Sequence, residues 1–345
     1  MSVTLREIAV DDPSWTQFVD GHPAATPFHC PAWTRLVADC YGFRASALVL
    51  TDTGGQTVAG LPLVRVRAPL RGERAICLPF TDNCGPLCAS SDFMTPLAEA
   101  AASWHNGLPM AVRAPLPEVA GWLRHEVAIL HTLRLAADPE SVFRTFKRTQ
   151  VQQPIGRAER QGVVVRRAES FADLRLYYEL HTQTRRRLGT PVQPLRFFRL
   201  LWERILSTGL GFAQLAFHEG RAIAGAVFLA WNGTVVYKYS ASDSAFWRLR
   251  PNNLVLWSAI RWGCTNGFRV FDFGRTDFDN PGLRDFKDGW GTRAEPLVYS
   301  TLGLQARAAR PVVPSQAAHM VSAFIRRSPP WVCRTLGELL YRYAA

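Results

Sequence analysis

The sequence predicts an α/β protein built from two domains with mixed central sheets, followed by a C-terminal helical tail. The chain has 345 residues, more than the roughly 100 to 200 residues of a usual domain. Its composition, with 48% hydrophobic and 20% charged residues, is typical of a protein with a packed core. Helix-like and strand-like segments alternate, and a similar order of elements occurs twice along the chain.

The first half of the chain predicts an N-terminal domain over residues 1–139. Apolar residues at helical spacing predict helices over 14–20, over 32–40 directly after Pro31, and around 96–104. Apolar runs bounded by turn residues predict strands over 43–50, 58–66 and 74–78, and further strands near Met110 and Ile129.

The second half predicts a C-terminal domain over residues 140–305. It opens with a charged helical segment over 140–160, in which Pro154 is expected to end or kink the helix near Gln153. The elements that follow are a strand at 163–166, helices at 172–188 and 195–207, strands at 211–217, 222–230 and 234–240, a helix at 253–264, a strand at 269–273, a helical turn at 283–289 and a strand at 295–301. This order is the plan of the GCN5-related acetyltransferase (GNAT) fold, so we expect two tandem GNAT-like domains.

The tail, residues 306–345, is interrupted by Pro311 and Pro314 and then predicts a helix. One face of that helix is apolar and carries Val332, Leu336, Leu339, Leu340 and Tyr343. Packing of this face on the body of the protein is the first interpretation. Peripheral contact with a membrane is the alternative, because a basic amphipathic helix with a tryptophan, here Trp331, can lie among lipid headgroups.

The positive charge is concentrated in the middle of the chain. Of the net charge of +12, a surplus of nine lies between Ser141 and Arg199, where thirteen basic residues face four acidic ones. Such a segment suits a polyanionic partner such as a nucleic acid, and an arginine-rich solvated surface is the alternative.

Several classes of protein are disfavoured. The N-terminus lacks the pattern of a signal peptide and no apolar stretch reaches the roughly 18 residues of a membrane span, so we expect a cytoplasmic monomer. Seven scattered cysteines favour neither a disulfide framework nor a zinc site, although Cys84 and Cys88 leave a weak alternative of a ligand or redox pair. No histidine has a serine and an acid at the spacing of a hydrolase triad. We expect no metal and no tightly held cofactor.

Five segments of the second half resemble the FemABX-type aminoacyltransferases, a tandem-domain family within the acetyltransferase superfamily. They are YYELHTQTRRRLGTP (177–191), VVYKYSASD (235–243), RPNN (250–253), FDFG (271–274) and LRDFKDGWG (283–291). The first half resembles the family only in FHCPAW (28–33) and LPFTD (78–82). The resemblance implies transfer of an amino acid from aminoacyl-tRNA to an amine, for instance on a peptidoglycan precursor or a natural-product intermediate. It also implies that Lys287 stabilises the oxyanion and that Arg187 binds a phosphate of the acceptor.

The residues themselves are compatible with this chemistry. Attack of an amine on an ester or thioester passes through a tetrahedral oxyanion, which a positive charge at Lys287 would stabilise by roughly 3 to 4 kcal/mol; a surface lysine between Asp285 and Asp288 is the alternative. Where acetyltransferases carry a glycine-rich loop for the pyrophosphate of coenzyme A, this sequence has Arg250-Pro251 and no glycine. We therefore expect an aminoacyl-tRNA donor, with acyl-coenzyme A as the alternative.

Further residues complete the predicted site. Tyr237 and Tyr239 lie two apart on the predicted strand that lines the cleft, so both are expected to face one side, towards the substrate; packing in the core with the hydroxyls reaching solvent is the alternative. The carboxylates of Asp272, Asp277 and Asp279 are expected at the end of a strand, and Asp277 is the candidate general base. The remaining candidates for substrate binding are Asn252, Asn253, Arg275 and Arg284.

Overall fold

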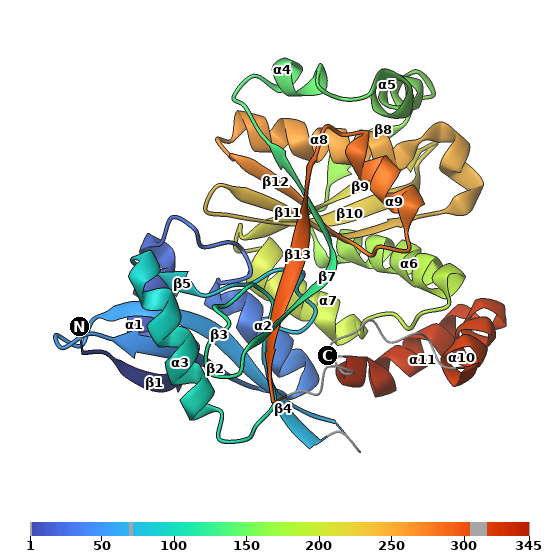
Figure 1. Ribbon diagram of the computed structural model, residues 1–345. Helices are drawn as coiled ribbons and strands as arrows, with labels where there is room; N and C mark the ends of the chain where they lie inside the picture. Colours follow the sequence, from blue (N-terminus) through green and yellow to red (C-terminus); the bar gives the residue numbers. More distant parts are fainter. Residues whose placement is uncertain (1, 69–71, 304–315, 345) are drawn as a thin grey trace. The chain divides into compact units, whose positions relative to one another are not determined.

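The computed structural model describes residues 2–68, 72–303 and 316–344 (Figure 1). The described residues divide into two compact units, one formed by residues 2–129 with 296–303 and the other by residues 130–295 with 316–344. The divisions fall within two strands, β7 (Leu123–Arg134) and β13 (Arg293–Leu302). The mixed α/β class is confirmed. The domain limits at residues 139 and 305 stay a prediction, and the second of them lies outside the described residues.

The first unit contains a mixed sheet with the strand order β1-β2-β3-β4-β6-β13, and β5 pairs with β3. The pairs are antiparallel except for β4 with β6, which run parallel. Three indoles, of Trp15, Trp33 and Trp122, lie in its core. Its elements are β1 (Thr4–Ala9), α1 (Pro13–Gly21), α2 (Pro31–Tyr41), β2 (Arg44–Thr51), β3 (Thr57–Ala68), β4 (Gly72–Cys77), β5 (Leu87–Cys88), α3 (Met94–Trp104) and β6 (Met110–Val112).

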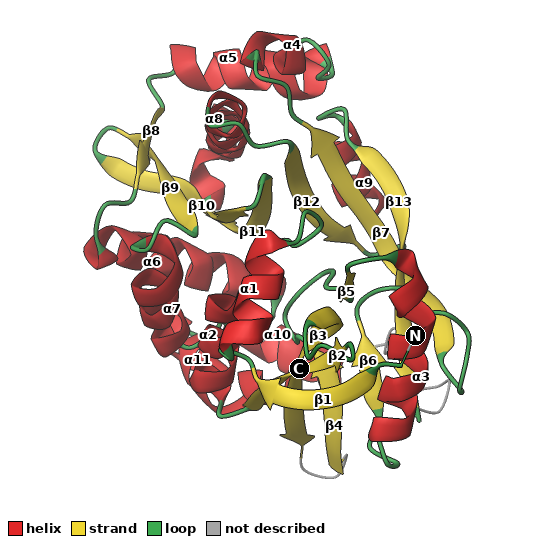
Figure 2. Ribbon diagram, turned by 90° about the vertical axis from the view of Figure 1, so that its left-hand side faces the viewer, coloured by secondary structure: helices red, strands yellow, loops and turns green. Residues whose placement is uncertain are grey.

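The second unit contains a sheet with the strand order β7-β12-β11-β10-β9-β8. Strands β8 to β11 form an antiparallel meander, and β12 pairs parallel with β11. Helix α8 covers one face, helices α6 and α7 cover the other, and α4 and α5 lie outside α8 (Figures 1 and 2). The elements are α4 (Pro139–Phe143), α5 (Gln153–Arg160), β8 (Val164–Arg167), α6 (Phe171–Leu188), α7 (Leu195–Leu201), β9 (Gly211–His218), β10 (Arg221–Trp231), β11 (Thr234–Ser242), α8 (Pro251–Thr265), β12 (Val270–Thr276) and α9 (Pro281–Asp288).

The segment around Pro154 differs in detail from its prediction. Residues 148–152 form a π-helical turn, and the α-helix α5 begins at Gln153, so Pro154 stands in the first turn of a helix and does not end one. A proline has no N–H to donate, and the first turn of an α-helix leaves that donor without an intrahelical partner in any case. The change from π to α geometry therefore takes place where a backbone hydrogen bond is missing.

Helix α6 has strong signals at both ends. Ser170 and Asp173 form a reciprocal capping box, in which the Ser170 hydroxyl accepts from the Asp173 N–H and the Asp173 carboxylate accepts from the Ser170 N–H. At the other end Gly189 has φ of 71°, the left-handed conformation that glycine adopts without strain. These signals fix the position of the arginines in the last turn of α6, among them Arg187.

The described part of the tail forms two helices, α10 (Gln316–Arg327) and α11 (Pro330–Leu340). Both pack on α6. Helix α11 docks through Cys333 and Gly337 and not through the predicted apolar face, of which Leu339, Leu340 and Tyr343 are exposed. Helix α10 was not predicted. The Cys333 thiol donates to Thr190 O at 3.3 Å, and Arg334 forms an ion pair with Glu179. Pro311 and Pro314 lie outside the described residues. Within the residues that the structure covers, no helix has both the length and the apolarity to cross a membrane.

The docking of α11 depends on Gly337. A Cβ atom added to this residue would lie 1.9 Å from Val192 O, a backbone atom that no side-chain rotation can move away. We expect the substitution Gly337→Ala to lower the free energy of unfolding by about 1 to 3 kcal/mol, the range of an overpacked contact. Urea denaturation followed by circular dichroism measures this, with Gly21→Ala, where a Cβ has open space, as control. Equal stability of the two variants would contradict the close contact.

Candidate active site

The two central strands of the second unit are paired only over part of their length. Residues Thr234–Val236 of β11 face Val270–Asp272 of β12, and the pairing does not continue into the carboxyl halves of these strands, all of whose residues are described. Backbone groups at the carboxyl ends of diverging parallel strands are free to meet a ligand, which is why open α/β sheets bind ligands there. The candidate site therefore lies at the carboxyl ends of β11 and β12.

A β-bulge in β11 places the two predicted tyrosines on opposite faces of the sheet. Phe228 pairs with Tyr237 and Val227 with Tyr239, so Lys238 is an extra residue without a partner in the register. The ring of Tyr237 stacks on Phe228 at 5.6 Å, on the side of α8, whereas Tyr239 lies 5.8 Å from the ring of His181 on α6. The expectation that both tyrosines face one side is therefore wrong, because strict alternation holds only for a strand without a bulge.

Lys287 is buried at the carboxyl end of β12. Its side chain reaches back from the last turn of α9, and the residue is 3% exposed. Its Nζ donates to Gly274 O at 2.9 Å and to Arg275 O at 2.8 Å. These carbonyl groups lie in the half of β12 that is not paired with β11, so the ammonium group donates to backbone acceptors at the carboxyl end of the strand. The alternative of a surface lysine is wrong.

A buried histidine lies beside Lys287. His131 of β7 is 0% exposed, and its Nδ1 lies 3.2 Å from Thr292 Oγ1 and 3.5 Å from Asp288 Oδ1. Because the Thr292 hydroxyl donates to Lys287 O, it accepts from His131 Nδ1–H, which leaves the lone pair on Nε2. Burial, and then the charge of Lys287, lower the pKa of His131, so the imidazole is neutral. No side chain or backbone group of the described residues bonds to its Nε2.

Arg187 and Asn252 meet at the carboxyl end of β11. Arg187 Nη1 donates to Ser242 O at 3.2 Å, and its guanidinium lies over the ring of Trp247 at 4.8 Å. The Ser242 hydroxyl accepts from Trp247 Nε1 at 2.9 Å and from Asn252 Nδ2 at 3.3 Å. Burial lowers the pKa of Arg187, and Asp243 opposes this shift. One serine thus joins two predicted substrate-binding residues to an indole that the sequence analysis did not single out.

Two cavities lie next to this cluster and share Arg250. One, of about 260 Å³, is lined by Gln150, Trp247, Arg250, Pro251, Asn252, Asn253 and Phe286. The other, of about 350 Å³, is lined by Thr149, Gln153, Pro154, Arg157, Arg160 and Arg250. Arg250 has φ of 57°, a strained conformation for a residue with a side chain, and such strain is common at functional sites. Three arginines and no carboxylate line the second cavity, so it favours an anion.

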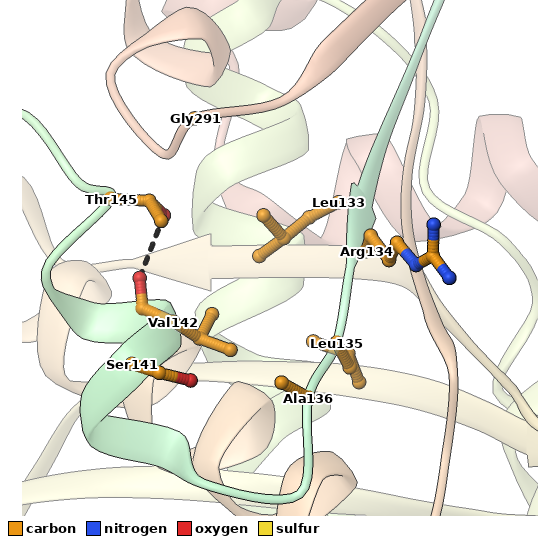
Figure 3. A pocket seen from close by; sticks show the side chains of 8 residues that line it. All are labelled: Leu133, Arg134, Leu135, Ala136, Ser141, Val142, Thr145 and Gly291. Carbon is orange, nitrogen blue, oxygen red and sulfur yellow. Dashed lines mark hydrogen bonds between the residues drawn. The ribbon is translucent and has the colours of Figure 1, made fainter.

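A third cavity, of about 320 Å³, lies apart from the predicted site residues. Leu133, Leu135 and Val142 give it apolar walls, Arg134 points away from it, and the hydroxyl group of Thr145 donates to Val142 O at its edge (Figure 3). None of the residues predicted to bind substrate lines this cavity.

The remaining candidates lie in more exposed positions. Arg275 and Asp277 form an ion pair, and the Asp277 side chain is 61% exposed. Arg284 Nε lies 3.9 Å from Asp288 Oδ2 on the surface of α9. Asp272 was expected at the strand end together with Asp277, and this expectation is wrong. Asp272 is buried within β12, where its carboxylate accepts a hydrogen bond from Gly274 N at 2.7 Å. Among the described residues, no three His, Cys, Asp or Glu side chains are placed to hold a metal ion.

Comparison with known proteins supports the fold. Residues 145–288 match the family model of the acetyltransferase (GNAT) domain. This segment has the GNAT-type fold. No curated protein matches the whole sequence significantly. The predicted tandem GNAT-like architecture agrees with the solved structures that the chain resembles.

Three of these solved structures are similar over most of the chain. FemX has a TM-score of 0.69 at 13% identity, over 86% of this chain and 96% of its own. The C-terminal domain of a putative lysylphosphatidylglycerol synthetase from Agrobacterium fabrum has a TM-score of 0.55 at 12% identity, over 90% and 94%. A tandem GNAT protein from the clavulanic acid biosynthesis pathway has a TM-score of 0.51 at 12% identity, over 88% and 100%. At these identities the likeness concerns the fold alone.

His181 makes the stability of the second unit sensitive to acid. Burial lowers the pKa of this histidine to about 4 in the folded protein, against the ordinary value near 6.5 in the unfolded chain. Unfolding therefore takes up a proton between these values, so the stabilisation is complete above about pH 6.5 and is lost as the pH falls towards 4, by roughly 3 kcal/mol.

We expect His181→Phe to flatten the dependence of the unfolding free energy on pH in this range, as measured by urea denaturation at successive pH values. The unchanged protein serves as the reference, because the buried His29, whose pKa burial also lowers to about 4, contributes equally to the slope in both proteins. An unaltered slope in the variant would show that His181 is not a group that titrates in this range.

Proposed function

We propose that this protein is an acyltransferase that forms an amide bond by moving an amino acid from aminoacyl-tRNA to an amine. The observation that carries the proposal is the buried ammonium group of Lys287 at the open carboxyl edge of β12, in a unit that also holds a cavity lined by three arginines. The amine is that of a peptidoglycan precursor or a natural-product intermediate, as the FemABX-type motifs suggest.

Lys287 is the proposed electrostatic catalyst. In the reaction the amine nitrogen forms a bond to the ester carbonyl carbon, the amine loses a proton to water or to a base such as Asp277, and the ribose oxygen leaves with a proton. The carbonyl oxygen is negative in the intermediate, and a preorganised positive charge stabilises it. Only three of the forty basic residues of this chain are lysines. A compact ammonium group, unlike a planar guanidinium, suits a confined position between two carbonyl groups.

The donor is proposed to bind through its phosphates at Arg157, Arg160 and Arg250. The backbone at the start of α8 offers few donors for the pyrophosphate of coenzyme A, because Pro251 has no N–H and the Asn253 N–H bonds to Arg250 O. Arginine side chains, in contrast, suit the spaced phosphates of a nucleic acid. The lysylphosphatidylglycerol synthetase among the similar folds bears a name that denotes an aminoacyl product, which agrees with this choice.

The acceptor is proposed to meet the cluster around Ser242. Arg187 would bind its phosphate, with Asn252, Asn253, Arg275 and Arg284 as further polar contacts. Tyr237 and Tyr239 would act from different faces of the sheet. Burial raises the pKa of Tyr237 to about 12, so its hydroxyl remains a neutral hydrogen-bond donor at physiological pH. No metal and no tightly held cofactor enters this proposal, and a cytoplasmic monomer agrees with a substrate made in the cytoplasm.

An acyl-coenzyme A-dependent N-acyltransferase is the second candidate. The specific observation in its favour is the match of residues 145–288 to the acetyltransferase (GNAT) domain. Thermal-shift titrations with charged tRNA and with acetyl-coenzyme A separate the two candidates, because only the true donor stabilises the fold at low concentration. Stabilisation by acetyl-coenzyme A alone would reject the aminoacyl-tRNA donor.

Replacing Lys287 by methionine tests its catalytic role. We expect the rate of amide formation from aminoacyl-tRNA to fall by about 10²- to 10³-fold, the effect of losing one oxyanion donor, while the Kd for charged tRNA stays within a factor of about three. Lys147→Met, at an exposed position, is the matched control. Because the substitution also leaves two carbonyl groups without their donor, activity is compared below the melting temperature of each variant. Full activity of the folded Lys287→Met variant would refute the role.

The arginine cavity is tested by the double substitution Arg157→Gln and Arg160→Gln. If both side chains contact phosphates, the affinity for tRNA falls, and the slope of log Kd against log salt decreases by about two. Filter binding over a range of salt concentrations measures the slope. Arg196→Gln with Arg204→Gln, two substitutions away from the cavity, controls for the loss of net charge. An equal change in both double variants would mean that charge alone, and no local site, binds the nucleic acid.

A further inference from the structure

Exposed apolar side chains are concentrated on the two helices of the tail. Among the described residues, thirteen large apolar side chains are strongly exposed, and seven of them belong to the short segment 316–344. These seven, which we call the tail surface, are Met320, Val321, Phe324, Trp331, Leu339, Leu340 and Tyr343. An exposed Leu188 ends α6 beside Gly189, which lies against Ser322 of α10. Such a gathering on one part of a protein indicates an interaction surface.

The tail surface is not an undocked core face. The inner side of the helices is already occupied, because Ile325, Cys333 and Gly337 are buried and both helices pack on α6 (Figure 1). Arg186 Nε also donates to Ser328 O at 2.5 Å, which holds the turn between the two helices. The apolar residues of the tail surface therefore remain exposed after the helices have found their place on the protein.

Positive charge accompanies this apolar surface. The segment 316–344 contains four arginines, Arg326, Arg327, Arg334 and Arg342, and one acid, Glu338. Arg334 pairs with Glu179, and the carboxylate of Glu338 accepts from Leu195 N at 3.3 Å, so both of these groups serve the docking. The other three arginines form no ion pair within the described residues, so the segment that carries the tail surface keeps a net positive charge.

We propose that the tail surface binds an anionic lipid bilayer. Helices with large apolar residues, a tryptophan and arginines lie in the interface of a membrane, where the apolar groups enter the acyl boundary and the arginines meet lipid phosphates. Trp331, which is 64% exposed, is of the residue type that favours this interface. A second copy of the chain is a poorer occupant, because a shared two-fold contact would bring two positively charged tail segments together. The inference does not depend on the proposed reaction.

Flotation of the full chain with vesicles tests the proposal. We expect the protein to float with vesicles of equal parts phosphatidylcholine and phosphatidylglycerol, and to bind about tenfold more weakly to pure phosphatidylcholine. The triple variant Met320→Ser, Phe324→Ser, Trp331→Ser should lose binding by about tenfold or more. Arg327→Gln with Arg342→Gln should lose the preference for the anionic vesicles.

Matched controls distinguish binding by the tail surface from nonspecific adsorption through other exposed apolar residues. The double variant Leu123→Ser, Val164→Ser removes exposed apolar groups elsewhere and should bind vesicles as the unchanged protein does. All substituted positions are exposed, so each variant should keep the melting temperature of the unchanged protein. Absence of binding to anionic vesicles, or equal binding of the triple variant, overturns the proposal. If the protein instead dimerises with rising concentration, does not bind vesicles, and the triple variant stays monomeric, the proposal is overturned and the tail surface is an interface with a second copy of the chain.

Discussion

The contact between the ammonium group of Lys287 and two carbonyl oxygens of β12 is the interaction on which the site depends. A parallel strand that parts from its neighbour leaves backbone acceptors without donors, and burying them unpaired costs about 1 to 3 kcal/mol each. Here Nζ satisfies Gly274 O and Arg275 O. The same group therefore stabilises the carboxyl end of β12 and places a positive charge there. Stability and chemistry cannot be separated at this residue.

The side chains near the carboxyl ends of β11 and β12 are divided between the two faces of the sheet. The bulge at Lys238 directs Tyr237 towards the core under α8 and Tyr239 towards α6 and α7. On the α8 side, the residue with the left-handed backbone, Arg250, is shared by two cavities. A neutral His131 lies beside the cation and does not compete with it for anions. The unit thus combines a buried cation, hydroxyl and amide groups, and an arginine-lined cavity, the groups on which the proposed acyl transfer rests.

The sequence predicted the order of most helices and strands, because periodicity, proline and glycine report local structure directly. It missed β1, whose segment TLREIA mixes charged and apolar residues as an edge strand can. The bulge in β11 was not predicted either, since the register depends on the partner strand. The burial of Lys287 and its position beside His131 depend on the tertiary structure. They require residues of β7 and α9 to come together, and no spacing along the chain predicts such a contact. Arg157 and Arg160 were visible only as part of a charge surplus.

The first unit is completed by residues from near the end of the chain. Ser300, Thr301 and Leu302 of β13 pair with Val112, Ala111 and Met110 of β6, so the sheet of this unit gains its last strand only after the entire GNAT-type segment has left the ribosome. During synthesis β6 remains without its partner strand β13 until the later residues are made, and contacts between residues so distant in sequence form slowly. A fragment that ends in the middle of the chain would lack that strand. If the two halves of the chain were expressed separately, neither would contain the complete sheet of the first unit.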